Sequence, residues 1–134
     1  MFVTLLCAIY EPAAGRLIYA SAGHPAAVLV REGKAELLPT DSGMAAGFMP
    51  GLEAQSQSVQ LQPGDLAVFY TDGVTEAFNA AGELFGDAKL LNALAHESSH
   101  TASETTAALL RSVRDHAAEH PQSDDIAILT LKRK

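Results

Sequence analysis

The chain has 134 residues, which is the size of one domain and is enough to bury a hydrophobic core. Apolar residues make up 48% of the sequence and charged residues 19%, a balance that excludes a disordered chain. Acidic residues outnumber basic ones 16 to 9, so the formal charge of -7 disfavours nucleic acid and anionic membrane as partners.

The N-terminal stretch bears on the compartment and on the start of the protein. "MFVTLLCAIYEP" lacks the basic region and the length of a signal peptide, and no stretch of the chain approaches the ~20 apolar residues of a membrane span. The single cysteine, Cys7, favours a reducing, cytoplasmic compartment, and its apolar surroundings predict a buried structural thiol. Because domains rarely open on a core strand, we interpret Met1 as an internal methionine of a longer protein, with a sensor domain as one candidate upstream segment.

The first part of the chain predicts paired strands. Phe2–Tyr10 is a continuous apolar run bounded by Pro12, which is typical of a strand covered on both faces. A turn at residues 11–16 leads to the strand "LIYASAG", so a hairpin is expected. A second hairpin is predicted from "AAVLVR" and "AELLP" around Gly33.

The middle of the chain combines a loop with two further strands. Residues 40–51, "TDSGMAAGFMPG", contain three glycines and a proline and predict a functional loop. "QSQSVQL" (55–61) alternates weakly, as an edge strand does, and "LAVFYT" (66–71) predicts a buried strand. Asp65, in the intervening "QPGD", is interpreted as a turn residue.

The last part of the chain predicts two helices and a closing strand. The first helix carries Leu90, Leu91 and Leu94 on one face. The second begins with a capping box of Thr101 and Glu104, followed by apolar residues at helical spacing: Leu109, Leu110, Val113 and Ala117. "IAILTL" (126–131) predicts a last buried strand. About six or seven strands, two helices and a closing strand indicate an α+β layered fold.

Aspartates stand at the ends of two of these strands. Asp72 follows one strand, and Asp124 and Asp125 immediately precede another. Strand ends meet at the rim of a sheet, and carboxylates brought together repel unless a cation compensates, so the pattern favours Mg²⁺ or Mn²⁺. Gly73 would let the backbone turn tightly beside the metal. The alternative is that Asp72 and Gly73 form only a turn and Asp124 only begins a strand.

Three sequence blocks resemble a known family. "MFVTLLCAIYEPAAGRLIYASAGHP", "LQPGDLAVFYTDGVTEAFNAAGELFG" and "SDDIAILTL" are similar to the SpoIIE/RsbU family of bacterial serine phosphatases, within the metal-dependent protein phosphatase (PPM) superfamily. The resemblance covers essentially the whole chain in the family's order. The second block is highly specific, and the "AGH" and "DDI" blocks are moderately so.

The resemblance implies a fold, a metal centre and a reaction. The fold is a β-sandwich flanked by helices, with two Mn²⁺ or Mg²⁺ ions at one end. Asp72 and Asp124 resemble metal ligands, Gly73 resembles the residue beside the metal, and Asp125 is a less favoured alternative to Asp124. The implied reaction is hydrolysis of phosphoserine or phosphothreonine by metal-activated water, without a covalent phosphoenzyme. The implied partner is a phosphorylated regulatory protein, such as an anti-sigma-factor antagonist.

The chain also departs from the family. The "D…GHG"-like motif, whose aspartate bridges the two metals, does not occur in this sequence, and His24 of "SAGHP" belongs to a different block. We therefore expect residues 1–134 to be the C-terminal portion of the phosphatase domain, incomplete at the N-terminus, with an incomplete dinuclear site. Where relatives tend to have "PLG", this chain has "MAAG" (Met44–Gly47).

Several other residues have weaker predicted roles. His24 is expected to make a structural hydrogen bond near the active-site end rather than to act in catalysis. Glu76 is either a supporting residue of the metal site or a first-turn acid of a helix beginning near Val74. The remaining histidines are expected on solvated helical faces: His96, His100, His116 and His120. The aromatic core candidates are Phe2, Phe69, Tyr70 and Phe85.

Three functions remain open from the sequence. The first is a metal-dependent phosphatase, as the resemblance implies. The second is a phosphatase-like binding adaptor without catalysis. The third is a fragment that associates through the apolar strand Phe2–Tyr10, which would then lie at a sheet edge.

Overall fold

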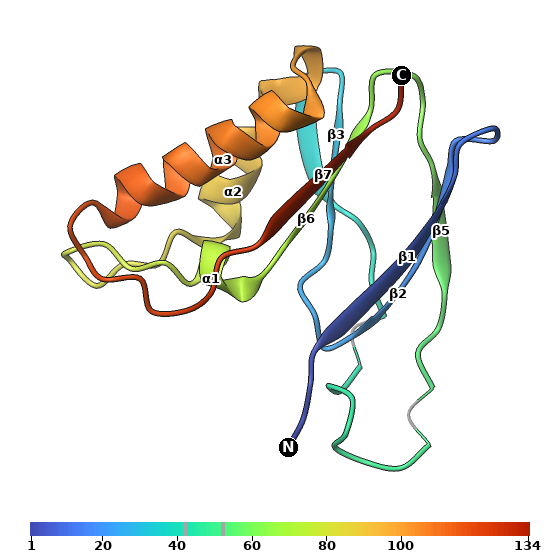
Figure 1. Ribbon diagram of the computed structural model, residues 1–134, viewed down its shortest axis with the longest axis horizontal. Coiled ribbons are helices and arrows are strands. Elements are labelled where there is room, and N and C mark those ends of the chain that lie inside the picture. The colour runs from blue at the N-terminus through green and yellow to red at the C-terminus, as the bar shows by residue number, and fades with distance from the viewer. Residues whose placement is uncertain (42, 52) are drawn as a thin grey trace.

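The computed structural model describes residues 1–41, 43–51 and 53–134 and contains two antiparallel sheets with helices on one side (Figure 1). The three-stranded sheet has the order β1 (Leu5–Glu11), β2 (Arg16–Ala22), β5 (Gln57–Gln60). The four-stranded sheet has the order β4 (Lys34–Leu37), β3 (Val28–Arg31), β6 (Leu66–Tyr70), β7 (Ile128–Lys132). The helices are α1 (Asp72–Thr75), α2 (Gly86–Ala95), the 3₁₀ turn η1 (Glu97–Ser99) and α3 (Ala102–Ala117). The α+β layered fold predicted from the sequence is confirmed.

The central strands β3 and β6 are buried on both faces. One face of the four-stranded sheet packs on α2 and α3, with Val28 and Val68 meeting Leu90 and Leu109. The other face packs on the three-stranded sheet through a second cluster: Leu17, Tyr19, Ala27, Leu29, Leu38, Leu61 and Ala67. Burial on both sides explains why these two strands are continuous apolar runs rather than alternating ones.

The first strand does not have the two covered faces that its sequence predicts. β1 pairs with β2 on one side and forms the edge of its sheet. Ile9 is 65% exposed and Phe2 60% exposed, and Cys7 is exposed rather than buried. The predictions of a doubly covered strand, a buried thiol and a core Phe2 are therefore wrong. The physical reason is that none of the described elements packs on the outer face of this sheet.

The closing strand is less buried than expected. β7 is the other sheet's edge, and Leu129 is 67% exposed. Ile128 packs against the helix-side core, and Leu131 packs against the cluster between the sheets. An apolar run marks the strand, but its place in the sheet decides how much of it is covered.

The helix predictions hold. In α3 the Thr101 side chain accepts from the Glu104 backbone, and the Glu104 carboxylate accepts from the Thr101 backbone, so the capping box is present. These bonds hold the pKa of Glu104 below its ordinary value. Leu109 and Val113 of α3 are buried against the sheet. Among the described residues, no helix combines the length and apolarity needed to cross a bilayer.

Within the predicted loop, residues 40–41 and 43–51 form neither helix nor strand apart from one bridge, in which Val3 pairs with Ala46. The predicted loop includes Ser42, which lies outside the described residues.

Asp65 has a larger role than that of a turn residue. Its side chain is 4% exposed and accepts from the Gln62 backbone N–H at 2.7 Å, which closes the turn. It also accepts from Arg31 Nε at 2.9 Å. The Arg31 guanidinium in turn donates to the carbonyl of Gln60 at 2.8 Å. Because Arg31 belongs to β3 and Gln60 to β5, this network ties the two sheets together.

Replacement of Asp65 by alanine tests this network. The substitution removes the acceptor shared by Arg31 and the turn N–H, so we expect the free energy of unfolding to fall by about 1–3 kcal/mol. The measurement is urea denaturation, with Asp115→Ala on the exposed side of α3 as the control. Equal midpoints for the two variants would contradict the proposed role of Asp65.

Candidate metal centre

The end of β6 is bonded directly to the segment that leads into β7. The backbone N–H of Thr71 donates to the carbonyl of Ala127 at 3.1 Å, and the Thr71 hydroxyl accepts from the Ala127 N–H at 3.0 Å. The same hydroxyl donates to the carbonyl of Asp125 at 2.9 Å. Thr71 therefore brings together residues more than fifty positions apart. The sequence does not mark Thr71 as a site residue, because only the pairing of β6 with β7 identifies its partners.

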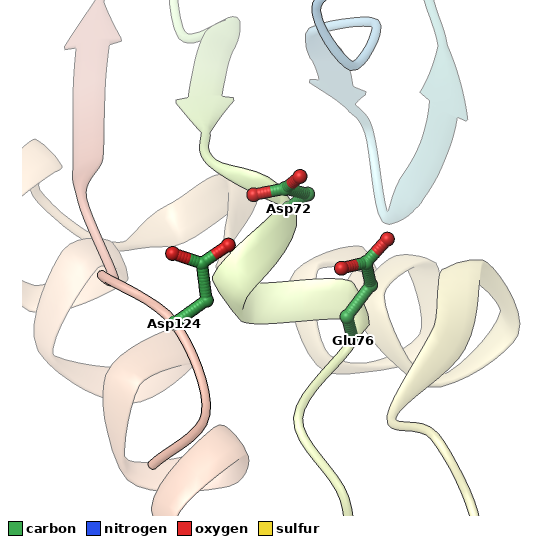
Figure 2. A group of neighbouring side chains, drawn as sticks. All are labelled: Asp72, Glu76 and Asp124. Carbon is green, nitrogen blue, oxygen red and sulfur yellow. The ribbon is translucent and has the colours of Figure 1, made fainter.

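Three carboxylates meet at this end of the sandwich. Asp72, Glu76 and Asp124 each offer an oxygen atom, and these atoms lie within 4.8 Å of one another (Figure 2). All three side chains are exposed, and they form the only such acidic or histidine group of three within residues 1–41, 43–51 and 53–134. Figure 2 shows Asp72 at the start of α1, Glu76 just after it, and Asp124 on the loop before β7.

Glu76 lies at the far end of α1 from the position expected of a first-turn acid. The helix begins at Asp72, and the backbone N–H of Glu76 donates to the carbonyl of Asp72 at 2.8 Å. This i to i+4 bond places the two side chains on one face of a single turn. The first-turn interpretation is therefore wrong, and the four-residue spacing was the signal that placed Glu76 beside Asp72.

Asp124 and Asp125 make different contacts. The Asp124 carboxylate belongs to the acidic group, and its Oδ1 also accepts from the Asp125 N–H at 2.7 Å. Gln122 donates to the Asp124 carbonyl at 2.8 Å and so holds the loop. Asp125 presents its backbone carbonyl, not its carboxylate, to Thr71. This geometry favours Asp124 over Asp125 as a candidate ligand.

Gly73 is required for close approach rather than for a tight turn. It is absent from the glycines with positive φ, so any residue could adopt its backbone conformation. A Cβ atom at Gly73 would lie 2.2 Å from the carbonyl oxygen of Asp125. The glycine therefore allows α1 to lie directly against the loop that carries Asp124, which is how the two aspartates come together.

Two members of the acidic group, Asp72 and Glu76, line a groove of about 610 Å³. Its lining includes Thr4, His24, Tyr70 and Asp87 beside Asp72 and Glu76. Neither lysine nor arginine is found among the described residues of the lining. A phosphate group in such a groove would be repelled by the carboxylates of Asp72, Glu76 and Asp87 unless a cation intervened. Exposed carboxylate oxygens at this spacing are ligands that Mg²⁺ and Mn²⁺ accept, so the residues fit a hard divalent ion.

The structure shows the surroundings of three of the histidines considered in the sequence. The half-buried His24 ring makes the expected hydrogen bond, from Nε2 to the Tyr70 carbonyl at 3.0 Å. His100 pairs with Glu97 at 2.9 Å on an exposed surface. His116 is an exception to the solvated-face prediction, because its ring packs edge-on against Phe85 at a centroid distance of 5.5 Å.

Solved structures identify the fold. The chain superposes on the PP2C phosphatase domain of SpoIIE from Bacillus subtilis with a TM-score of 0.80, at 18% identity, over 96% of this chain and 37% of that one. It superposes on the RsbU and RsbW domains of a Mycobacterium tuberculosis protein with a TM-score of 0.78, at 23% identity, over 98% of this chain and 36% of that one. The fold is that of a PP2C-type phosphatase domain.

Sequence comparison identifies the family. The model of Stage II sporulation protein E (SpoIIE) matches residues 1–134, and the chain belongs to the SpoIIE family. Protein IcfG of Synechocystis sp. (strain ATCC 27184 / PCC 6803 / Kazusa) is 33% identical over 135 residues, covering 99% of this chain and 21% of that protein. The chain thus spans about a fifth of this curated relative and little more than a third of the two solved chains.

Replacement of Gly73 by alanine tests the close approach. The added methyl group would force α1 away from the Asp125 carbonyl, so we expect the Asp72–Asp124 separation to grow and Mn²⁺ affinity to fall by at least ~10-fold. Isothermal titration calorimetry measures the affinity. Gly82→Ala, where a Cβ would meet open space but a positive φ adds strain, controls for the general cost of adding a side chain. Unchanged Mn²⁺ affinity in the Gly73 variant would refute this role.

The raised pKa of Tyr70 predicts that the free energy of unfolding falls at high pH. Burial, and secondarily the Asp87 carboxylate, raises the pKa of Tyr70 from 10.0 to about 12. Between these pH values the unfolded chain loses the phenolic proton while the folded chain keeps it, so the free energy of unfolding falls as pH rises. Tyr70→Phe should reduce this slope in urea midpoints measured from about pH 9 to about pH 12. Tyr19, whose pKa burial also raises, would supply the remaining slope, and an unaltered slope in the variant would contradict the assignment.

Proposed function

We propose that this chain carries metal-binding carboxylates of a serine/threonine phosphatase that acts on a phosphorylated regulatory protein in the cytoplasm. The observation that carries the proposal is the meeting of Asp72, Glu76 and Asp124. Asp72 and Glu76 also line a groove that has neither lysine nor arginine in its described lining. Membership of the SpoIIE family supports the same reaction class.

The three carboxylates would hold the ion, Mn²⁺ or Mg²⁺. When bound there, such an ion would supply Lewis-acid chemistry for phosphate oxygens and for the activation of water. The position of Asp72 is fixed by Thr71, whose hydrogen bonds hold the preceding backbone on one side. Glu76 follows from Asp72 through the helical turn, and Gln122 steadies the loop of Asp124.

A second ion is the part of the proposal that rests on family resemblance. The bridging aspartate of the "D…GHG"-like motif has no counterpart in these 134 residues. We propose that a complete dinuclear centre draws this aspartate from other residues of the natural protein. The family resemblance also suggests the substrate, which would be an anti-sigma-factor antagonist or a related phosphoprotein. An upstream sensor domain would control access of this substrate to the metal centre.

Substitution of the aspartates tests the proposal. Asp72→Asn and Asp124→Asn should each weaken Mn²⁺ binding by the chain by at least ~10-fold, because each removes a charged oxygen ligand. Hydrolysis of p-nitrophenyl phosphate with Mn²⁺, measured on a longer natural protein that contains this chain, should fall by at least ~100-fold. Asp125→Asn is the matched control, since its carboxylate lies outside the acidic group, and it should leave both quantities unchanged.

The outcomes separate the phosphatase from the adaptor. Unchanged turnover in Asp72→Asn would refute the assigned role of Asp72. Mn²⁺ binding by the chain without turnover in any longer natural form would favour the adaptor. Tight binding of two ions by the 134-residue chain alone would contradict the proposed need for a further aspartate.

A further inference from the structure

The carbonyl of Tyr70 lies where a sheet ladder has ended. Thr71 bonds to Ala127 on the β7 side, and successive strand residues direct their carbonyls to opposite sides, so the Tyr70 carbonyl points toward β3. The pairing of β3 with β6 stops at Val28 opposite Val68, however, and offers no strand partner at Tyr70. Because Tyr70 is 4% exposed, its carbonyl needs a donor from elsewhere in the protein.

The ring of His24 supplies that donor. Its Nε2 atom lies 3.0 Å from the Tyr70 carbonyl oxygen. A carbonyl can only accept, so Nε2 carries the hydrogen and donates it. The other ring nitrogen, Nδ1, faces the hydroxyl of Thr4 at 3.5 Å, which can donate to it. The bond to Tyr70 crosses from the end of the three-stranded sheet to the end of β6.

The turn before His24 is built to hold the ring there. The buried hydroxyl of Ser21 donates to the His24 carbonyl at 3.0 Å and accepts from its N–H at 3.2 Å. Gly23 has φ +69°, and a Cβ atom there would lie 2.9 Å from the backbone nitrogen of Ala45. Both the hydroxyl and the glycine are therefore required to keep His24 in place.

We propose that His24 is a positioning residue for Asp72. Its Nε2–H bond fixes the last carbonyl of β6, two residues before the aspartate, while Thr71 fixes the opposite side of the same strand end. The orientation of Asp72 toward Asp124 and Glu76 then depends on both contacts. This inference rests on the proposed metal site, and it gives the "SAGH" block (Ser21–His24) a function within it.

The test uses two substitutions that differ only in reach. Glutamine at position 24 places an amide N–H where Nε2 lies, whereas asparagine places one only as far as Nδ1. His24→Asn should therefore weaken Mn²⁺ binding by ~10-fold, the lower end of the range for residues that orient metal ligands. His24→Gln should restore most of the affinity. Thr101→Ala controls for stability, because it removes the N-cap of α3 without touching the groove.

A metal-free measurement keeps the inference separate from the proposed function. In ¹⁵N spectra of the chain without metal, we expect His24 as the Nε2–H tautomer, and we expect the amide signals of Asp72 and Gly73 to shift in His24→Asn and to return in His24→Gln. If these amide shifts occur but the chain does not bind Mn²⁺, the proposed metal site is refuted, and the proposal that His24 positions Asp72 is still supported. Equal Mn²⁺ affinity and unshifted amides in all His24 variants would overturn the inference. Loss of affinity in Thr101→Ala equal to that in His24→Asn would also overturn it.

Discussion

The site depends on the immobilised end of β6. Thr71 bonds this end to the Asp125–Ala127 segment on one side, and His24 bonds it on the other. A strand that ends at the rim of a sheet would otherwise fray, because its last carbonyls have no ladder partner. With both sides occupied, the backbone leaves β6 in one direction, and Asp72 begins α1 at a fixed place. Glu76 and the loop of Asp124 are then located relative to that place.

Bringing three carboxylates within 4.8 Å works against stability in the absence of a cation. The arrangement persists because other bonds hold the backbone that carries it, and Gly73 removes the one side chain that would keep α1 and the loop apart. Like charges gathered at an exposed rim are typical of a site built for a ligand rather than for the fold. The net charge of the whole chain is -7, which has the same negative sign as the carboxylates of the groove and would also attract a cation.

The two sheets are joined by polar contacts at both ends as well as by the apolar layer between them. At the start of β6, the Asp65–Arg31 pair reaches the carbonyl of Gln60 in the other sheet. At the end of β6, His24 reaches Tyr70. Apolar packing alone lets sheets slide, whereas directional bonds specify their alignment. The two contacts thus lie at the two ends of β6, and the candidate ligand Asp72 begins α1 just beyond it.

The sequence by itself determined the local elements and the candidate aspartates. Some features depend only on neighbours along the chain, so they could be predicted. These are the spacing of apolar residues in strands and helices, the turn residues and the Thr101 capping box. The placement of Asp72 and Asp124 at strand ends was predictable for the same reason. Only the tertiary structure decided the exposure of Cys7, the inclusion of Glu76 and the close-approach role of Gly73. Each of these depends on which distant segment packs beside the residue, and neither periodicity nor local spacing specifies that neighbour.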